Sequence, residues 1–129
     1  MSVSQSEKRR ELEDLGIIIQ KETEAIQGLI SDGNVQSENV FDRKKMLASA
    51  LNDRGRLWYR LVEFDKAVTD YTAAVEYDDA LAAAYFNRGT IHYRLGDFDL
   101  AAADMSRAVS LEPENEEFQK GYHESKMML

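Results

Sequence analysis

The residues best able to do chemistry in this chain are two histidines and a few adjacent pairs of acids. His92 and His123 are the only imidazoles, the acidic pairs include Asp78-Asp79 and Glu116-Glu117, and the sequence contains no cysteine. Catalysis would require several such groups to converge, and zinc would require histidine or cysteine ligands at short spacings. Neither acidic pair has the alternating Asp pattern of a calcium loop. The sequence therefore predicts a protein that is not an enzyme, with no catalytic residue, no metal site and no cofactor.

Two stretches of the sequence instead carry side chains suited to recognition. On a helix, three- and four-residue steps bring residues onto one face, and two such sets are present. The first set is Asn52, Arg56, Tyr59 and Arg60, and the second is Phe86, Asn87, Thr90, Tyr93 and Arg94. Their amide donors, aromatic faces and forked guanidinium groups suit an extended or helical peptide that carries a carboxylate or an aromatic anchor. The alternative is that these arginines are ordinary solvated residues of a helix surface.

The elements that must position these side chains are helices. Only one proline and seven glycines occur among 129 residues, a length that suits one domain. Between residues 57 and 75 the apolar positions recur at three- and four-residue steps, as in an amphipathic helix, and period-two runs typical of strands are absent. The sequence therefore predicts an all-α fold.

The strongest pattern is an internal repeat with a constant offset of 34 residues. The segment that begins at Ala50 matches the segment that begins at Ala84 without gaps. The matched pairs include Arg54/Arg88, Gly55/Gly89, Tyr59/Tyr93, Arg60/Arg94, Leu61/Leu95, Phe64/Phe98, Asp70/Asp104 and Ala74/Ala108. A constant period of this size indicates stacked units of two helices.

A period of 34 residues built from paired helices resembles the tetratricopeptide repeat family. The family pattern falls on two units, 48–81 and 82–115. In the first unit it falls on Leu51, Gly55, Tyr59, Leu61, Phe64, Ala67 and Ala74, and in the second on Tyr85, Gly89, Tyr93, Leu95, Gly96, Phe98, Ala101, Ala108 and Pro113. The departures are Val62 for the turn glycine, Asp79 for the proline, and Arg54 and Arg88 where the family commonly has leucine. The resemblance implies a tetratricopeptide-repeat α-solenoid of antiparallel helix hairpins.

The resemblance also implies where the function resides. In this family the first helices of the hairpins line a concave groove, and the second helices form the convex back. The groove positions of the family correspond to the two recognition sets given above, with Asp53 beside them. We therefore expect a non-catalytic protein-protein interaction module, or adaptor, whose groove binds an acidic or aromatic-anchored peptide segment of a partner protein.

A more specific function in this family is the binding of chaperone tails. It uses a clamp of a Lys and an Asn in one repeat, an Asn in the next, and a Lys/Arg pair in the third. Asn87 matches the middle Asn, but Phe118 and Tyr122 stand where the cations should be, and alignment one unit earlier places Asp53 at an Asn position. We expect the clamp to be broken, which makes a co-chaperone role the less favoured interpretation.

Residues outside the two units are expected to complete the stack, because repeat units cannot bury their apolar faces alone. Residues 116–129 predict a C-terminal capping helix. Residues 1–6 are expected to be disordered, and residues 7–47 to form a helical segment. That segment is either a degenerate first repeat with a polar insertion near 31–41, which we favour, or one long helix.

A structural subunit is the alternative function. The apolar positions 12, 15, 19, 26 and 29 fit a heptad seam that could dock on a partner or dimerise, although Glu22 interrupts this short seam. The expected state is a monomer or a weak dimer.

The formal net charge of −8 is unevenly distributed. The expected first helices, 46–62 and 80–96, hold five basic residues and one acid, whereas 63–79 and 97–117 hold two basic residues and thirteen acids. We therefore expect an acidic back and a locally basic groove. The acidic total argues against nucleic acid as a partner, and the lack of a long apolar run argues against a membrane span or a signal peptide. A cytoplasmic location is expected, with the nucleus as the alternative.

Overall fold

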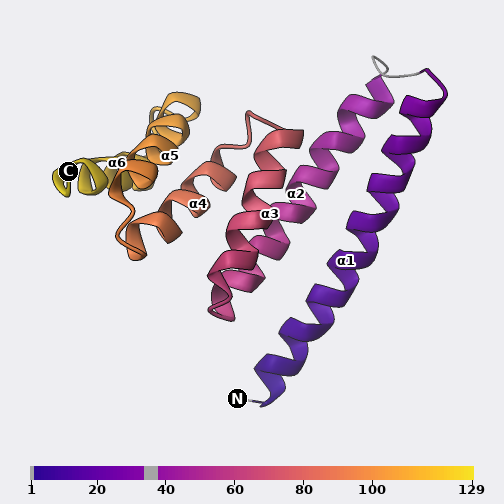
Figure 1. The fold of residues 1–129 in the computed structure, drawn as a ribbon, viewed down its shortest axis with the longest axis horizontal. Helices are drawn as coiled ribbons and strands as arrows, with labels where there is room; N and C mark the ends of the chain where they lie inside the picture. Colours follow the sequence, from indigo (N-terminus) through magenta and orange to yellow (C-terminus); the bar gives the residue numbers. More distant parts are fainter. Residues whose placement is uncertain (1, 34–37) are drawn as a thin grey trace.

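The structure is a computed structural model that describes residues 2–33 and 38–129. Over these residues the chain forms six α-helices and no strand, which confirms the all-α prediction. The helices follow one another side by side in an open stack (Figure 1). They are α1 Ser2–Ser31, α2 Glu38–Arg60, α3 Phe64–Tyr77, α4 Ala82–Arg94, α5 Phe98–Leu111 and α6 Glu116–Met127.

Two antiparallel hairpins, α2 with α3 and α4 with α5, form the centre of the stack. The same repeat position has a left-handed backbone in both turns, with φ of 61° at Val62 and 83° at Gly96. Glycine adopts this conformation readily, whereas a β-branched side chain is crowded by the carbonyl that follows it. The turn geometry of the repeat therefore persists in the first hairpin although its glycine has been replaced.

Small residues allow the helices of the stack to approach one another. Four alanines of α3 and α5 have no exposed surface: Ala67, Ala74, Ala101 and Ala108. A Cβ atom at Gly55 would lie 2.5 Å from Cε1 of Tyr71, so only glycine leaves room for that ring. The core falls into three clusters, which contain Leu47 with Leu51, Tyr71 with Ile91, and Tyr85 with Phe118.

The N-terminal segment is one long helix, so the degenerate first repeat that we favoured is wrong. α1 continues through residues 20–22, where a two-helix repeat would have required a turn, because these residues include neither glycine nor proline. Residues 2–6, which we expected to be disordered, form its first turns. Of the expected insertion near 31–41, residues 34–37 lie outside the described residues, and α2 already begins at Glu38.

The apolar side of α1 that suggested a heptad seam packs on α2. Ile26 is buried in the same cluster as Leu47, and Ile19 packs against that cluster. Glu22, which interrupts the seam, is 7% exposed and accepts a hydrogen bond of 2.9 Å from the guanidinium of Arg43. Seam positions 19, 22 and 26 are thus occupied within the chain, and dimerisation through them would require α1 to leave α2.

The last helix, α6, lies at the opposite end of the stack from α1 (Figure 1). It begins after Asn115, whose side-chain oxygen accepts a hydrogen bond from the backbone N–H of Phe118. Phe118 is buried and stacks on Phe86 of α4, with ring centroids 4.8 Å apart. This contact places α6 beside the first helix of the second hairpin.

Candidate functional site

Three hollows follow one another along the first helices of the stack. Hollow 1, between α1 and α2, is lined by Glu11, Asp14, Leu15, Ile18, Asp53, Arg56, Leu57 and Arg60. Hollow 2, between α2 and α4, is lined by Arg56, Tyr59, Arg60, Tyr71, Phe86, Asn87 and Thr90. Hollow 3, between α4 and α6, is lined by Phe86, Thr90, Tyr93, Arg94, Met105, Glu117, Lys120, Gly121, Glu124 and Ser125. Because neighbouring hollows share two residues each, the three form one groove.

The structure brings eight of the nine predicted recognition residues to this groove: Arg56, Tyr59, Arg60, Phe86, Asn87, Thr90, Tyr93 and Arg94. The ninth, Asn52, is buried and lines none of the three hollows. Its side-chain oxygen accepts a hydrogen bond of 3.0 Å from the side-chain amide of Asn87. Asn52 therefore joins α2 to α4, and one hydrogen-bond donor of the groove residue Asn87 is already used.

The arginines of the groove differ in the hydrogen bonds and ring contacts that they already form within the chain. Arg56 and Arg60 are exposed and form no ion pair with any residue that the structure describes. Arg94 donates a hydrogen bond of 3.0 Å to the hydroxyl of Tyr59 and lies 5.7 Å from the centroid of that ring. It also lies 5.8 Å from the ring centroid of Phe64. Arg94 thus connects α4 to the first hairpin, while Arg56 and Arg60 are available to a ligand.

Tyr71 of α3 reaches between the first helices and borders hollow 2, a cavity of about 280 Å³. Burial raises the pKa of its hydroxyl well above the ordinary tyrosine value, and the positive charges of Arg56 and Arg60 act in the opposite direction. The phenol is therefore protonated at neutral pH and is a hydrogen-bond donor beside the two free guanidinium groups.

Hollow 3 combines an apolar wall with a charged rim. The wall is formed by Phe86, Tyr93 and Met105, and the rim carries Glu117, Lys120 and Glu124. Nζ of Lys120 lies 3.9 Å from Oε1 of Glu124, so this cation has a partner one helical turn away. The α6 end of the groove therefore presents carboxylates and one paired lysine where the chaperone clamp requires free cations.

Sequence reasoning missed the contributions of α1, α3 and α5 to the groove. Tyr71 and Met105 are separated by the repeat offset of 34 residues, and they border hollow 2 and hollow 3 respectively. The internal alignment could therefore have identified one position of the second helices as a floor position. The residues that α1 supplies had no such signal, because α1 has no counterpart in the repeat.

No metal site is assembled in the part of the chain that the structure describes, since it contains no group of three His, Asp or Glu side chains placed to bind an ion. None of the described helices is long and apolar enough to cross a bilayer. His92 lines none of the hollows; its Nε2 lies 3.8 Å from Oδ2 of Asp104, and its Nδ1 is buried without a hydrogen-bond partner.

Comparison with family models identifies the class of protein. The model described as tetratricopeptide repeat matches residues 82–115, and a second one, described as TPR repeat, matches residues 55–96. Together with the stack of hairpins, these matches show that the chain belongs to the tetratricopeptide repeat family. Domains of this family are in general non-catalytic interaction modules. No curated protein matches the sequence.

Solved structures with a similar fold are tetratricopeptide repeat domains as well. The domain of Arabidopsis OM64 has a TM-score of 0.62 at 25% identity and covers 92% of this chain and 99% of that one. The second domain of human RPAP3, in complex with the Hsp70 peptide SGPTIEEVD, has a TM-score of 0.59 at 20% identity and covers 87% and 98%. The TPR2B domain of yeast Sti1, in a complex with pHsp70, has a TM-score of 0.59 at 14% identity and covers 88% and 99%. Likeness at these identities establishes the fold of the chain.

Proposed function

We propose that this chain is an adaptor that binds a peptide segment of a partner protein in the groove formed by the three hollows. The observation that supports the proposal is that the guanidinium groups of Arg56 and Arg60 are unpaired. Both border hollow 2 without an ion pair to any described residue, and no acidic side chain lines that hollow. Two unpaired guanidinium groups in a recess are suited to an anionic side chain of a ligand.

The chemistry of hollow 2 favours an acidic or aromatic anchor. A carboxylate in this hollow can accept hydrogen bonds from the two guanidinium groups and from the protonated phenol of Tyr71. The rings of Tyr59 and Phe86 offer an apolar surface beside these donors, which suits an aromatic side chain. A partner segment with both features can therefore be held at this point of the groove.

The chaperone tails bound by some structural neighbours are not the ligands that we propose. Asn87, which matches an Asn of the clamp, already donates to Asn52. On α6, Glu117 and Glu124 face hollow 3, where a pair of cations would be needed to hold a tail of consecutive acids. We also do not propose dimerisation through α1, because Ile19 and Ile26 of its apolar seam already pack against the core that α1 shares with α2.

The groove is tested with a random dodecapeptide library displayed on phage, panned against the folded chain. We expect enriched peptides, and we expect the variant Arg56→Glu/Arg60→Glu to bind them about tenfold or more weakly, as for the loss of charge-assisted contacts. Because both residues are exposed and unpaired, its melting temperature should be close to that of the unmodified chain.

The matched control reverses two cations on the convex back, Lys66→Glu and Arg107→Glu, which changes the net charge by the same amount. Lys66 and Arg107 lie on α3 and α5 and line none of the three hollows. We expect this control to keep the affinity. Failure to enrich any peptide, or equal weakening in both double variants, would show that the groove is not the binding site.

A further inference from the structure

Hollow 1 extends the groove beyond the tandem repeats. Four of its lining residues come from α2, and the other four come from α1, which is not part of a repeat hairpin. Its cavity volume of about 410 Å³ exceeds that of hollow 2. Since Arg56 and Arg60 border both hollows, a segment bound in hollow 2 that continues toward the N-terminal end of the stack enters hollow 1 directly.

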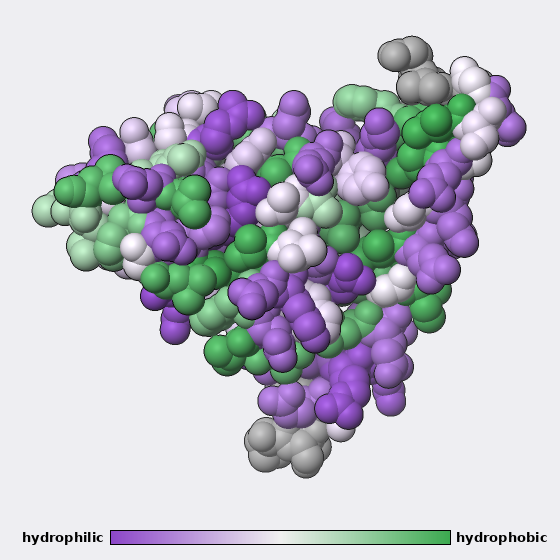
Figure 2. All heavy atoms as spheres, viewed as in Figure 1, coloured by the Kyte–Doolittle hydropathy of each residue, from purple (hydrophilic) through white to green (hydrophobic). Residues whose placement is uncertain are grey.

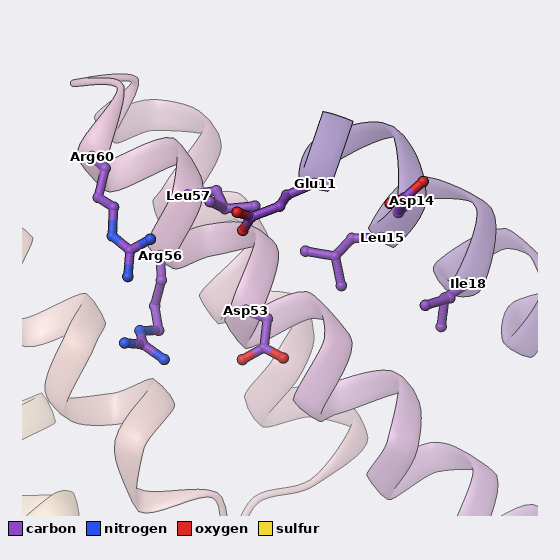
Figure 3. A pocket seen from close by; sticks show the side chains of 8 residues that line it. All are labelled: Glu11, Asp14, Leu15, Ile18, Asp53, Arg56, Leu57 and Arg60. Carbon is purple, nitrogen blue, oxygen red and sulfur yellow. The ribbon is translucent and has the colours of Figure 1, made fainter. Parts of the chain in front are cut away.

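The hollow has an apolar floor and lies beyond the stretch in which α1 and α2 are closely packed. They are joined by the ion pair of Glu22 with Arg43 and by the cluster that contains Ile26. Farther toward the N-terminus of α1, Leu15 projects toward α2, and Leu15, Ile18 and Leu57 border the open space (Figure 3). Ile18 is 46% exposed and Leu15 is partly exposed, so the uncovered apolar surface belongs to α1, whereas Leu57 of α2 is buried beneath it.

The rim of hollow 1 carries both acidic and basic side chains, and these form no ion pairs with one another. Glu11, Asp14 and Asp53 supply three carboxylates, and Arg56 and Arg60 supply two guanidinium groups. None of the five forms a salt bridge with another described residue. Arg56 and Arg60 lie on neighbouring turns of α2, and Glu11 projects from α1 toward that helix (Figure 3). Glu11 and Asp14 of α1 thus lie across the apolar floor from Arg56 and Arg60 of α2, while Asp53 lies on α2 itself.

The geometry points to a bipolar partner segment, in which a Lys or Arg meets the α1 carboxylates Glu11 and Asp14, an apolar side chain covers Leu15 and Ile18, and an Asp or Glu meets Arg56 and Arg60. This inference rests on the proposed function and specifies its ligand. Packed helices lie about 8–10 Å apart and an extended chain advances about 3.3 Å per residue, so the basic and acidic residues of the ligand are about three positions apart.

Charge complementarity selects this occupant over a uniformly acidic one. A segment of consecutive acids would place carboxylates against Glu11, Asp14 and Asp53, and such like-charge contacts at an interface are unfavourable. A uniformly basic segment would meet the same difficulty at Arg56 and Arg60. The outer edge of α1 is mainly hydrophilic in the view of Figure 2.

The composition of the peptides enriched from the dodecapeptide library tests the inference. We expect a Lys or Arg about three positions from an Asp or Glu, with an apolar residue between them. The variant Glu11→Lys/Asp14→Lys should bind a selected bipolar peptide about tenfold more weakly and should instead enrich peptides without the basic residue. The control Glu13→Lys/Glu24→Lys changes two exposed acids of α1 outside the hollow and should behave like the unmodified chain.

The outcomes separate this inference from the proposed function. Enriched peptides that are acidic throughout, with equal affinity for the unmodified chain and for Glu11→Lys/Asp14→Lys, would overturn the inference and leave the groove proposal standing, provided that Arg56→Glu/Arg60→Glu abolishes their binding. A library that yields no peptide would overturn both. Circular dichroism of each variant checks that α1 remains helical.

Discussion

Arg54 of α2 and Asp70 of α3 are joined by two parallel hydrogen bonds of 2.7 and 2.8 Å. The arrangement recurs 34 residues later, where Arg88 and Asp104 are joined by bonds of 2.8 and 2.7 Å. The hydrogen bonds to Asp70 raise the pKa of Arg54 further above its ordinary value, and burial acts against them. Each hairpin of this chain is thus fastened by a bidentate ion pair at a position where the family commonly has leucine.

Breaking one of these pairs should be costly. Asp70 is almost fully buried, so Asp70→Ala leaves the guanidinium of Arg54 half-buried without its partner. We expect the free energy of unfolding to fall by about 3 kcal/mol, measured by urea denaturation. The double variant Arg54→Leu/Asp70→Ala, which removes both charges, should recover most of that loss. A double variant as unstable as Asp70→Ala would show that the pair itself, rather than the unpaired charge, determines stability.

The turn at Val62 offers a stabilising substitution. Val62 has a positive φ and is 69% exposed, so Val62→Gly relieves backbone crowding without removing buried contacts. We expect the free energy of unfolding to rise by about 1 kcal/mol. Glu63→Gly serves as the control, because its φ of −97° suits any residue and glycine there should be neutral or destabilising. A drop in stability for Val62→Gly would contradict the strain at this turn.

The close approach of α2 to α3 predicts opposite results for two glycine substitutions. In Gly55→Ala the new Cβ would meet the buried ring of Tyr71, and we expect a loss of about 2 kcal/mol. In Gly28→Ala of α1 the new Cβ has no neighbour within 4 Å, and the higher helix propensity of alanine should add up to about 1 kcal/mol. Thermal denaturation of the two variants shows whether each substitution lowers or raises the stability. Equal effects would mean that Tyr71 can move aside.

The buried phenol of Tyr71 predicts a stability that decreases in alkali. Because the folded protein holds this proton more tightly than the unfolded chain, its contribution is complete below the ordinary tyrosine pKa of about 10 and is lost as the pH rises above it. Between about pH 9 and pH 11 we expect Tyr71 to account for a loss of about 1 kcal/mol, which should be missing in Tyr71→Phe. Urea denaturation at both pH values measures the free energy of unfolding. An equal decrease in the unmodified chain and in Tyr71→Phe would refute the prediction.

The chaperone-tail peptide SGPTIEEVD, which the second domain of human RPAP3 binds, should bind this chain weakly or not at all. The reason is the carboxylates of Glu117 and Glu124 on α6, together with the engagement of Asn87 by Asn52. Isothermal titration calorimetry measures the affinity directly. Micromolar binding that disappears in Asn87→Ala would show that the clamp operates in this chain.

The hairpins could be predicted because each rests on local signals that occur twice. The constant offset located both turns, although Val62 replaced the glycine, and the three- and four-residue spacing placed eight recognition residues in the groove. Asn52 was misplaced because spacing alone cannot distinguish a residue that faces the groove from one that bridges two helices just behind it. Its side chain accepts a hydrogen bond from Asn87, a residue 35 positions away.

The N-terminal helix could not be predicted in the same way. The degenerate first repeat was inferred by analogy with the two units, but residues 20–22, where its two helices would have been separated by a turn, favour continuation of a helix. Glu22 interrupts the apolar pattern, yet it is buried because Arg43 neutralises it across the helix pair. A charge that is matched only by tertiary contact resembles an exposed residue in the sequence. Hollow 1 had no sequence signal because α1 has no counterpart in the repeat.

The sharing of Arg56 and Arg60 between two hollows has a thermodynamic consequence. Ligand side chains in hollow 1 and hollow 2 draw on the same pair of guanidinium groups, so filling one hollow alters the free energy of filling the other. Contributions measured by substituting ligand residues one at a time should therefore not sum to the total binding energy. The groove recognises a combination of neighbouring residues as a unit, and two partners with the same composition in a different order should be distinguished.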